Sequence, residues 1–400
     1  MCIRDSSVAA PTAAASAPAP PSITPAGAWT TGLTHTVGAG ASRLLVFVSC
    51  SEKTSDSDLT LVTYGGQTLT QAVEVAYLAG NTTRCEIWYL NEAGIQAASG
   101  TTFVVTWGSG TPSGVGYAAR TFVEVDQSAP ILDTASATQA SGFTITTPAF
   151  NVAKDGIAVT GAGHGSGGSY NNGAWGAGWT EGTDQSPSGW TVGTANTTSP
   201  YGAAGTDIAT ATHTVSTNRQ AMVAVSLTPL VPTYSISGTV FEDVNYGGGA
   251  GRSLAASSGV ARSGAKVELY DAAGAFADST TTDGSGQYSF SVTDGVYTVR
   301  VVNATTTSSR TGYISALRSV QTFRTDASSG TAAAVTNKIG GEIPHEVDAP
   351  TNTTNATLAA LNAVVGQEVQ SPSPVTVSGA DVPGVDFGFN FSTIVNTNNA

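Results

Sequence analysis

Charged residues are scarce in this 400-residue chain. Asp, Glu, Lys and Arg make up 11% of it, whereas about a quarter is usual for a soluble domain. Acids outnumber bases 28 to 15, so the formal net charge is −13. The negative excess is spread along the chain and would repel phosphate backbones and anionic membranes. Nucleic-acid partners and membrane insertion of this segment are therefore not expected.

Long apolar runs and helical periodicity are also missing. No stretch of 18 apolar residues occurs, which excludes a membrane-spanning helix. Between residues 26 and 230 no segment shows apolar residues at i, i+3, i+4 and i+7, and parallel sheets need crossover helices. The remaining pattern, short Val-, Thr- and Tyr-rich runs between Gly, Asn and Ser clusters, predicts an all-β protein of antiparallel β-sandwiches.

The sequence carries no catalytic motif. A G-x-S-x-G nucleophile elbow is absent, and His35, His164, His213 and His345 are dispersed without metal-ligand spacing. We therefore expect that the chain is not an enzyme.

Cysteine is rare, with only Cys2, Cys50 and Cys85. A Cys50–Cys85 bridge would close a loop of 35 residues and add about 4 kcal/mol in the chain-entropy model. Two unlinked buried thiols are the alternative. Cys2 lies in "MCIRDS", which is similar to a translated sequencing-adapter fragment, so it is set aside.

Composition changes along the chain predict two domains joined at the proline-bearing "LVPTY". An Ala/Pro-rich segment leads in, and the chain stops where a further module would begin. The predicted boundaries are residues 1–25 for an artefactual or disordered lead-in, 26–230 for a first sandwich, 231–391 for a second sandwich with an insertion at 305–380, and 392–400 for the truncated start of another module.

The first domain contains "VTYGGQTLT", "CEIWYL" and "EVDQSAPI". These segments resemble a recurring bacterial extracellular β-sandwich of jelly-roll or lectin-like type. The resemblance implies architecture and carries no activity.

The second domain alternates apolar and polar residues with the period of a strand. Lys266, Glu268 and Arg300 fall on the opposite faces and are expected to meet water. The residues expected to face the core are Tyr234, Ile236, Val240, Val267, Leu269, Tyr288, Phe290, Val292, Tyr297, Val299, Val301, Val385, Phe387, Phe389 and Phe391.

The series "SGTVFEDVN", "SGAKVELYDAAG", "TTTDGSGQYSFSV" and "GVYTVRV" appears in order over residues 234–302. It resembles the B-type modules of serine-aspartate-repeat and collagen adhesins, that is, SdrD B-like and Cna B-type domains. The resemblance implies a transthyretin-like (prealbumin-like, immunoglobulin-like) sandwich over residues 232–391. It also implies a stalk module of an extracellular or cell-surface bacterial adhesin.

One loop has part of a calcium-binding pattern. In "DVNYGGG", Asp243 and Asn245 alternate as oxygen ligands should, but Gly247 stands where a third would follow. Calcium needs six to eight oxygens, so Asp283 would have to come from elsewhere in the fold. The alternative is a glycine-rich connection between strands. Any calcium there would be structural, and no other cofactor is expected.

Residues 164–190 hold an aromatic segment, "HGSGGSYNNGAWGAGWTEGTDQSPSGW". Exposed aromatic faces beside amides are what sugar rings and peptides dock against. The alternative is that the tryptophans belong to core strands. The candidate ligand-binding residues are His164, Tyr170, Trp175, Trp179 and Trp190.

These observations favour a non-catalytic structural and adhesive segment of a secreted or cell-surface bacterial protein, acting as stalk and display modules. Its partners would be neighbouring domains of a longer chain and a glycan or protein ligand at the cell exterior, such as a component of the extracellular matrix. The alternative is the carbohydrate-binding module region of a larger extracellular enzyme.

Overall fold

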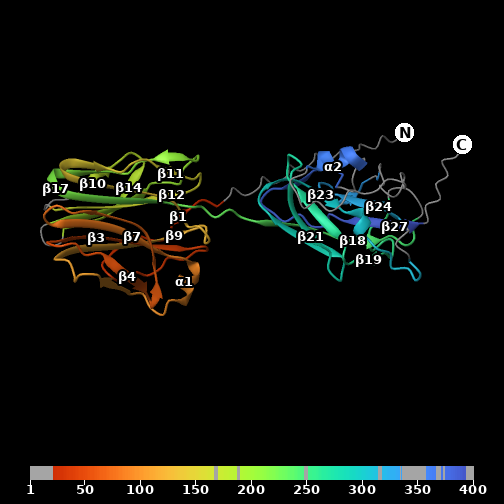
Figure 1. Cartoon of the computed structure of the whole chain (residues 1–400), viewed down its shortest axis with the longest axis horizontal. Coiled ribbons are helices and arrows are strands. Elements are labelled where there is room, and N and C mark those ends of the chain that lie inside the picture. Colours follow the sequence, from red (N-terminus) through yellow and green to blue (C-terminus); the bar gives the residue numbers. More distant parts are fainter. Residues whose placement is uncertain are drawn as a thin grey trace, which may run out of the picture. The chain divides into compact units, whose positions relative to one another are not determined.

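The computed structural model is nearly all β. It forms two compact units, Pro21–Val231 (the N-terminal unit) and the chain from Pro232 onward (the C-terminal unit), shown in Figure 1. The residues described are 21–165, 170–186, 190–246, 251–313, 318–333, 335, 357–365, 371–372 and 374–392.

The first large sheet of the N-terminal unit has the strand order β1-β9-β3-β7-β6, with β2 also on β9. All its pairings are antiparallel, and the central strand β3 is buried along most of its length. Its strands are β1 (Thr24–Pro25), β2 (Thr30–Thr31), β3 (Leu44–Lys53), β6 (Thr70–Tyr77), β7 (Thr82–Leu90) and β9 (Gly114–Val123).

The second large sheet has the order β10-β17-β12-β15-β14, with β13 on β17, and a short β11-β16 pair accompanies it. Its longest strand, β17, pairs antiparallel with both β10 and β12. The strands are β10 (Ile131–Thr146), β11 (Phe150–Val152), β12 (Ile157–His164), β13 (Tyr170–Trp175), β14 (Trp179–Gln185), β15 (Thr191–Thr197), β16 (Gly205–Asp207) and β17 (Thr210–Leu227).

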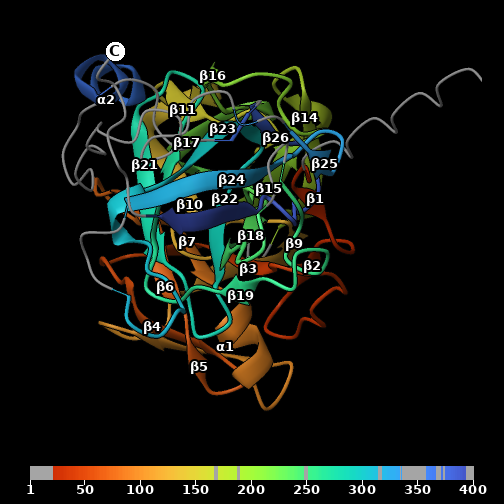
Figure 2. The ribbon, with the colours of Figure 1, turned by 90° about the vertical axis from the view of Figure 1, so that its right-hand side faces the viewer.

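A small third sheet, β5-β4-β8, covers the other face of the first sheet. It comprises β4 (Leu59–Tyr64), β5 (Gln67–Thr68) and β8 (Phe103–Trp107), and Figures 1 and 2 both place helix α1 (Glu92–Ala97) beside it. Figure 1 shows the resulting layers, from β4 through β3 and β12 to β11. Both large sheets are therefore buried on two faces, which requires apolar residues on both sides of their strands.

The predicted boundary at residue 26 is wrong by several residues. Residues 21–25 are ordered: β1 pairs with the end of β9, and Ile23 is fully buried in the core between the two large sheets. One apolar side chain in an Ala/Pro-rich context gave too weak a signal to predict this strand. Residues 1–20 of the expected lead-in, and 393–400 of the expected further module, lie outside the described residues.

The C-terminal unit is a sandwich of two main sheets. One has the order β19-β18-β27-β24-β25 with β22 also on β18, and the other has the order β21-β20-β23-β26. Figure 2 labels β18, β22 and β24 of the first sheet. The strands are β18 (Tyr234–Glu242), β19 (Val260–Ala261), β20 (Lys266–Tyr270), β21 (Phe276–Thr281), β22 (Gln287–Val292), β23 (Gly295–Val301), β24 (Arg318–Asp326), β25 (Thr331–Ala332), β26 (Val375–Val377) and β27 (Phe387–Ser392), with a 3-10 turn at Asn303–Thr305 and helix α2 at Leu358–Val365.

The alternation predicted for this unit is confirmed. Every apolar residue assigned to the core from the sequence belongs to, or packs against, one continuous cluster between the two sheets. The period of two determines which side chains meet there.

Two features of the C-terminal unit differ from the expectation. Strand β27 runs parallel to the end of β18, so the sheets are not wholly antiparallel. The segment 305–380 is also more than an insertion, because β24 pairs with β27 in one sheet and β26 pairs with β23 in the other. Strand β26 has only three residues, and β24 carries few apolar residues among its nine, so neither shows the alternation that would have predicted these pairings.

Candidate functional site

The two cysteines of the N-terminal unit lie opposite each other on β3 and β7, and a disulfide joins them. Both are fully buried between the large sheets. The bridge cross-links two strands that are already neighbours and closes a loop of 35 residues.

The aromatic segment does not present its tryptophans to solvent. Trp175 and Trp179 are 5% and 9% exposed and pack in the core on the outer face of the second sheet. Trp190 is 1% exposed and packs between the two large sheets, close to Gly114 and Gly163. These side chains therefore offer no open aromatic face on which a sugar ring could stack.

His164 is also fully buried, and its ring lies 4.3 Å from that of His213, centroid to centroid. Burial lowers the pKa of His213 to about 4, although a hydrogen bond to Gln220 opposes the shift. Tyr170 belongs to β13, where its backbone is paired with that of His213. This pair was not anticipated as a unit, because the two histidines are far apart in the sequence.

Two other buried groups of the N-terminal unit have perturbed pKa values. His35 bridges the hydroxyls of Thr30 and Thr121, and burial lowers its pKa to about 4. Glu86 on β7 accepts hydrogen bonds from the Leu59 N–H and the Trp88 indole, yet burial raises its pKa to about 7. Since Leu59 begins β4, this carboxyl group connects the small sheet to the first large sheet.

Two buried acids lie where β18 ends, Glu242 as its last residue and Asp243 as the first residue of the following loop. Burial opposes ionisation of Glu242, but hydrogen bonds from Ser308 and Ser309 and the charge of Arg310 outweigh it, so the pKa of Glu242 is lowered. The neighbouring Asp243 is fully buried.

The Asp243 carboxylate has no hydrogen-bond donor among the described residues. Its nearest charge is Arg252, whose Nη2 lies 3.6 Å from Oδ1. Asn245 donates from Nδ2 to the Ser257 carbonyl at 3.5 Å. A carboxylate buried in this way fits one ligand of a hard cation.

The third candidate ligand, Asp283, lies in the turn between β21 and β22. Its Oδ1 accepts the N–H groups of Ser285 and Gln287, so it holds that turn. The turn joins strands of opposite sheets. Among the described residues, no three His, Cys, Asp or Glu side chains are grouped so that they could hold a metal ion. Gly247 lies outside the described residues.

The expectation that Glu268 and Arg300 face water is wrong. Both are fully buried and form an ion pair of 2.6 Å, and the Tyr270 hydroxyl donates to Glu268 Oε2 at 2.7 Å. Their opposed positions on β20 and β23 explain the pairing. Alternation placed them correctly on the face away from the core cluster, but it could not show that this face is also covered.

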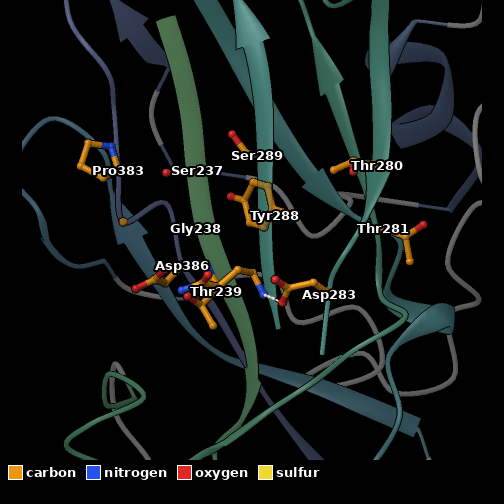
Figure 3. Close-up of a pocket in the computed structure, with 12 residues that line it drawn as sticks. Ser237, Gly238, Thr239, Thr280, Thr281, Asp283, Tyr288, Ser289, Pro383 and Asp386 are labelled. Carbon is orange, nitrogen blue, oxygen red and sulfur yellow. Dashed lines mark hydrogen bonds between the residues drawn. The ribbon is translucent and has the colours of Figure 1, made fainter. Parts of the chain in front are cut away.

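A polar pocket of about 540 Å³ lies beside the middle of β18 and the start of β22. Figure 3 shows Asp386, Thr239 and Asp283 in a row along it, with Tyr288 and Ser289 beside them. The Thr239 N–H donates to Asp386 Oδ1 at 2.7 Å, and burial raises the pKa of Asp386 despite that bond. Sequence reasoning missed this pocket, because Asp386 lies about a hundred residues beyond Asp283.

The C-terminal unit is thus a two-sheet sandwich with one continuous core between its sheets. A family model of the SdrD B-like domain matches residues 234–353, so this part of the chain is similar to that family. The family consists of non-enzymatic structural modules, typically of bacterial surface proteins. This confirms the resemblance seen in the sequence.

Other comparisons add little. One similar solved structure is the T6 backbone pilin of serotype M6 Streptococcus pyogenes, which has a modular three-domain structure. The alignment covers 92% of this chain and 70% of the pilin chain, at 11% sequence identity and with a TM-score of 0.21. None of the curated proteins compared with the chain matches it. No helix in the described part of the chain has the length and apolar character needed to cross a membrane.

Proposed function

We propose that the chain is a non-catalytic segment of a secreted or cell-surface bacterial protein, in which two tandem β-sandwich units space and display neighbouring domains. The observation that carries this proposal is the SdrD B-like match over residues 234–353. The disulfide between central strands of the N-terminal unit supports it, since a cross-link of this kind suits an oxidising exterior.

The alternative, a carbohydrate-binding module region of a larger enzyme, loses its main argument when Trp175, Trp179 and Trp190 are buried. We therefore retain the structural role alone.

A single-molecule pulling measurement on the full chain tests the proposal. A spacer should give two separate unfolding events, each requiring substantial force. Unfolding of the C-terminal unit at trivially low force would contradict the role, and so would turnover in a broad hydrolase substrate screen.

We also propose that any structural calcium binds at Asp243, with Asn245 beside it. The support is the burial of a carboxylate that accepts no hydrogen bond from the described residues. Calcium should then raise the melting temperature of the C-terminal unit relative to excess chelator, and Asp243→Asn should abolish that difference. An equal melting temperature with calcium and with chelator would refute the site.

A further inference from the structure

The pocket at β18 and β22 is formed by four parts of the C-terminal unit. Ser237 and Thr239 come from β18, Thr280 and Thr281 from the end of β21, and the loop before β27 closes one side. Figure 3 shows this arrangement. The remaining lining residues are Gly238, Asp283, Gln287, Tyr288, Ser289, Pro383, Gly384 and Asp386.

The pocket carries negative charge without compensation. Asp283 and Asp386 both line it, and no Arg, Lys or His is among the lining residues. Neither carboxylate forms an ion pair with any described residue. Asp386 is half-buried, and Thr239 is the only described residue that donates a hydrogen bond to its carboxylate. Water would therefore screen the attraction between a bound cation and Asp386 less than it screens an exposed ion pair.

The neutral part of the lining consists mostly of hydroxyl groups. Ser237, Thr280, Thr281 and Ser289 each bring a hydroxyl, which both donates and accepts, and Gln287 adds an amide. The Thr239 hydroxyl is already hydrogen-bonded to Asp386. A lysine side chain would match the carboxylates but would bring an aliphatic stem to these hydroxyls. A sugar that carries an amino group matches both the carboxylates and the hydroxyls.

We propose that this pocket binds an amino-sugar chain, with a sugar ammonium beside the carboxylates of Asp283 and Asp386 and sugar hydroxyls bonded to the Ser and Thr side chains around them. The volume of about 540 Å³ suits one or two sugar rings. This binding role goes beyond the spacing role proposed above and does not depend on it.

The test is a calorimetric titration of the full chain with the glucosamine trimer. Saturable binding should appear, and the N-acetylated trimer should bind at least tenfold more weakly because it lacks the ammonium group. Asp386→Asn and Asp283→Asn should each weaken binding about tenfold or more. Both substitutions keep the oxygen that accepts the backbone N–H groups of Thr239, or of Ser285 and Gln287, so the fold should be preserved.

Asp278→Asn is the matched control. Asp278 lies on β21 outside the pocket and is exposed, so this substitution makes the same change of charge and should alter binding less than twofold. Melting temperatures of all variants establish that each is folded. Absence of saturable binding by the native chain, equal binding of the acetylated trimer, or equal binding of a lysine-containing peptide would each overturn the proposal.

Discussion

Arg300 offers the sharpest test of how the C-terminal unit is held together. Its guanidinium and the Glu268 carboxylate are both fully buried and lie 2.6 Å apart. Arg300→Met removes one charge and leaves the other in a low-dielectric site, a change that costs about 3–5 kcal/mol. For a unit of this size each kcal/mol shifts the melting temperature by about 2–4 °C, so a loss of roughly 6–20 °C is expected.

The chain allows the two units to be followed separately. All six tryptophans lie between residues 29 and 190, so tryptophan fluorescence reports on the N-terminal unit alone, while calorimetry records both. Arg300→Met should lower only the calorimetric transition that fluorescence does not detect.

Two further variants separate a buried charge from a general packing defect. The double variant Glu268→Leu/Arg300→Met should recover most of the loss, because no unpaired charge remains. Lys154→Met, which breaks an exposed ion pair with Asp155, should cost less than about 1 kcal/mol. A loss below about 1 kcal/mol for Arg300→Met, or no recovery in the double variant, would refute the reasoning.

Four more outcomes are expected. Reduction of Cys50–Cys85 should destabilise the N-terminal unit by about 4 kcal/mol, measured as an earlier fluorescence transition in denaturant. Burial lowers the pKa values of His35 and His213 to about 4, so the unfolded chain binds protons more readily than the folded unit between pH 6.5 and 4. The free energy of unfolding should therefore be full above pH 6.5 and fall by up to about 3 kcal/mol per histidine as the pH is lowered toward 4. His213→Gln should reduce this acid sensitivity. Glu86 acts in the opposite sense, because its raised pKa gives a stabilisation that is complete below pH 4.5 and lost as the pH rises through 7; Glu86→Gln should flatten the stability profile over that window. Gly238→Ala should severely destabilise the C-terminal unit, since a Cβ would overlap the Val385 carbonyl, whereas Gly284→Ala, with open space around it, should be tolerated; similar melting temperatures for the two would contradict the packing described.

Alternation along strands was enough to predict the core of the C-terminal unit, since the inward positions of β18, β20, β22, β23 and β27 all meet in one cluster. It could not predict what covers the outward face. Glu268 and Arg300 were therefore assigned to solvent although they are buried together. The period of two identifies a face, but burial depends on whether another layer packs on it.

The same limit applies to the candidate sites. From the sequence, Trp175, Trp179 and Trp190 suit a binding surface or a core equally well. The layers on both faces of the second sheet bury the first two in one cluster and Trp190 in another. Asp283 and Asp386 line the same pocket although they are far apart in the sequence, and no local sequence pattern predicts that they do. For Cys50 and Cys85 the sequence allows a bridge or two unlinked thiols, and the opposed positions of the two residues on β3 and β7 decide for the bridge.

The most direct test of the two-sandwich spacer is the length released when the full chain is pulled. At about 3.5 Å per residue, the N-terminal unit of 211 residues (21 to 231) should release about 740 Å when reduced and, with 35 residues held back by the disulfide, about 620 Å when oxidised. The account predicts that this one event lengthens by about 120 Å on reduction while the event of the C-terminal unit keeps its length. A single gradual extension without discrete events, or a release that is the same in both redox states, would contradict it.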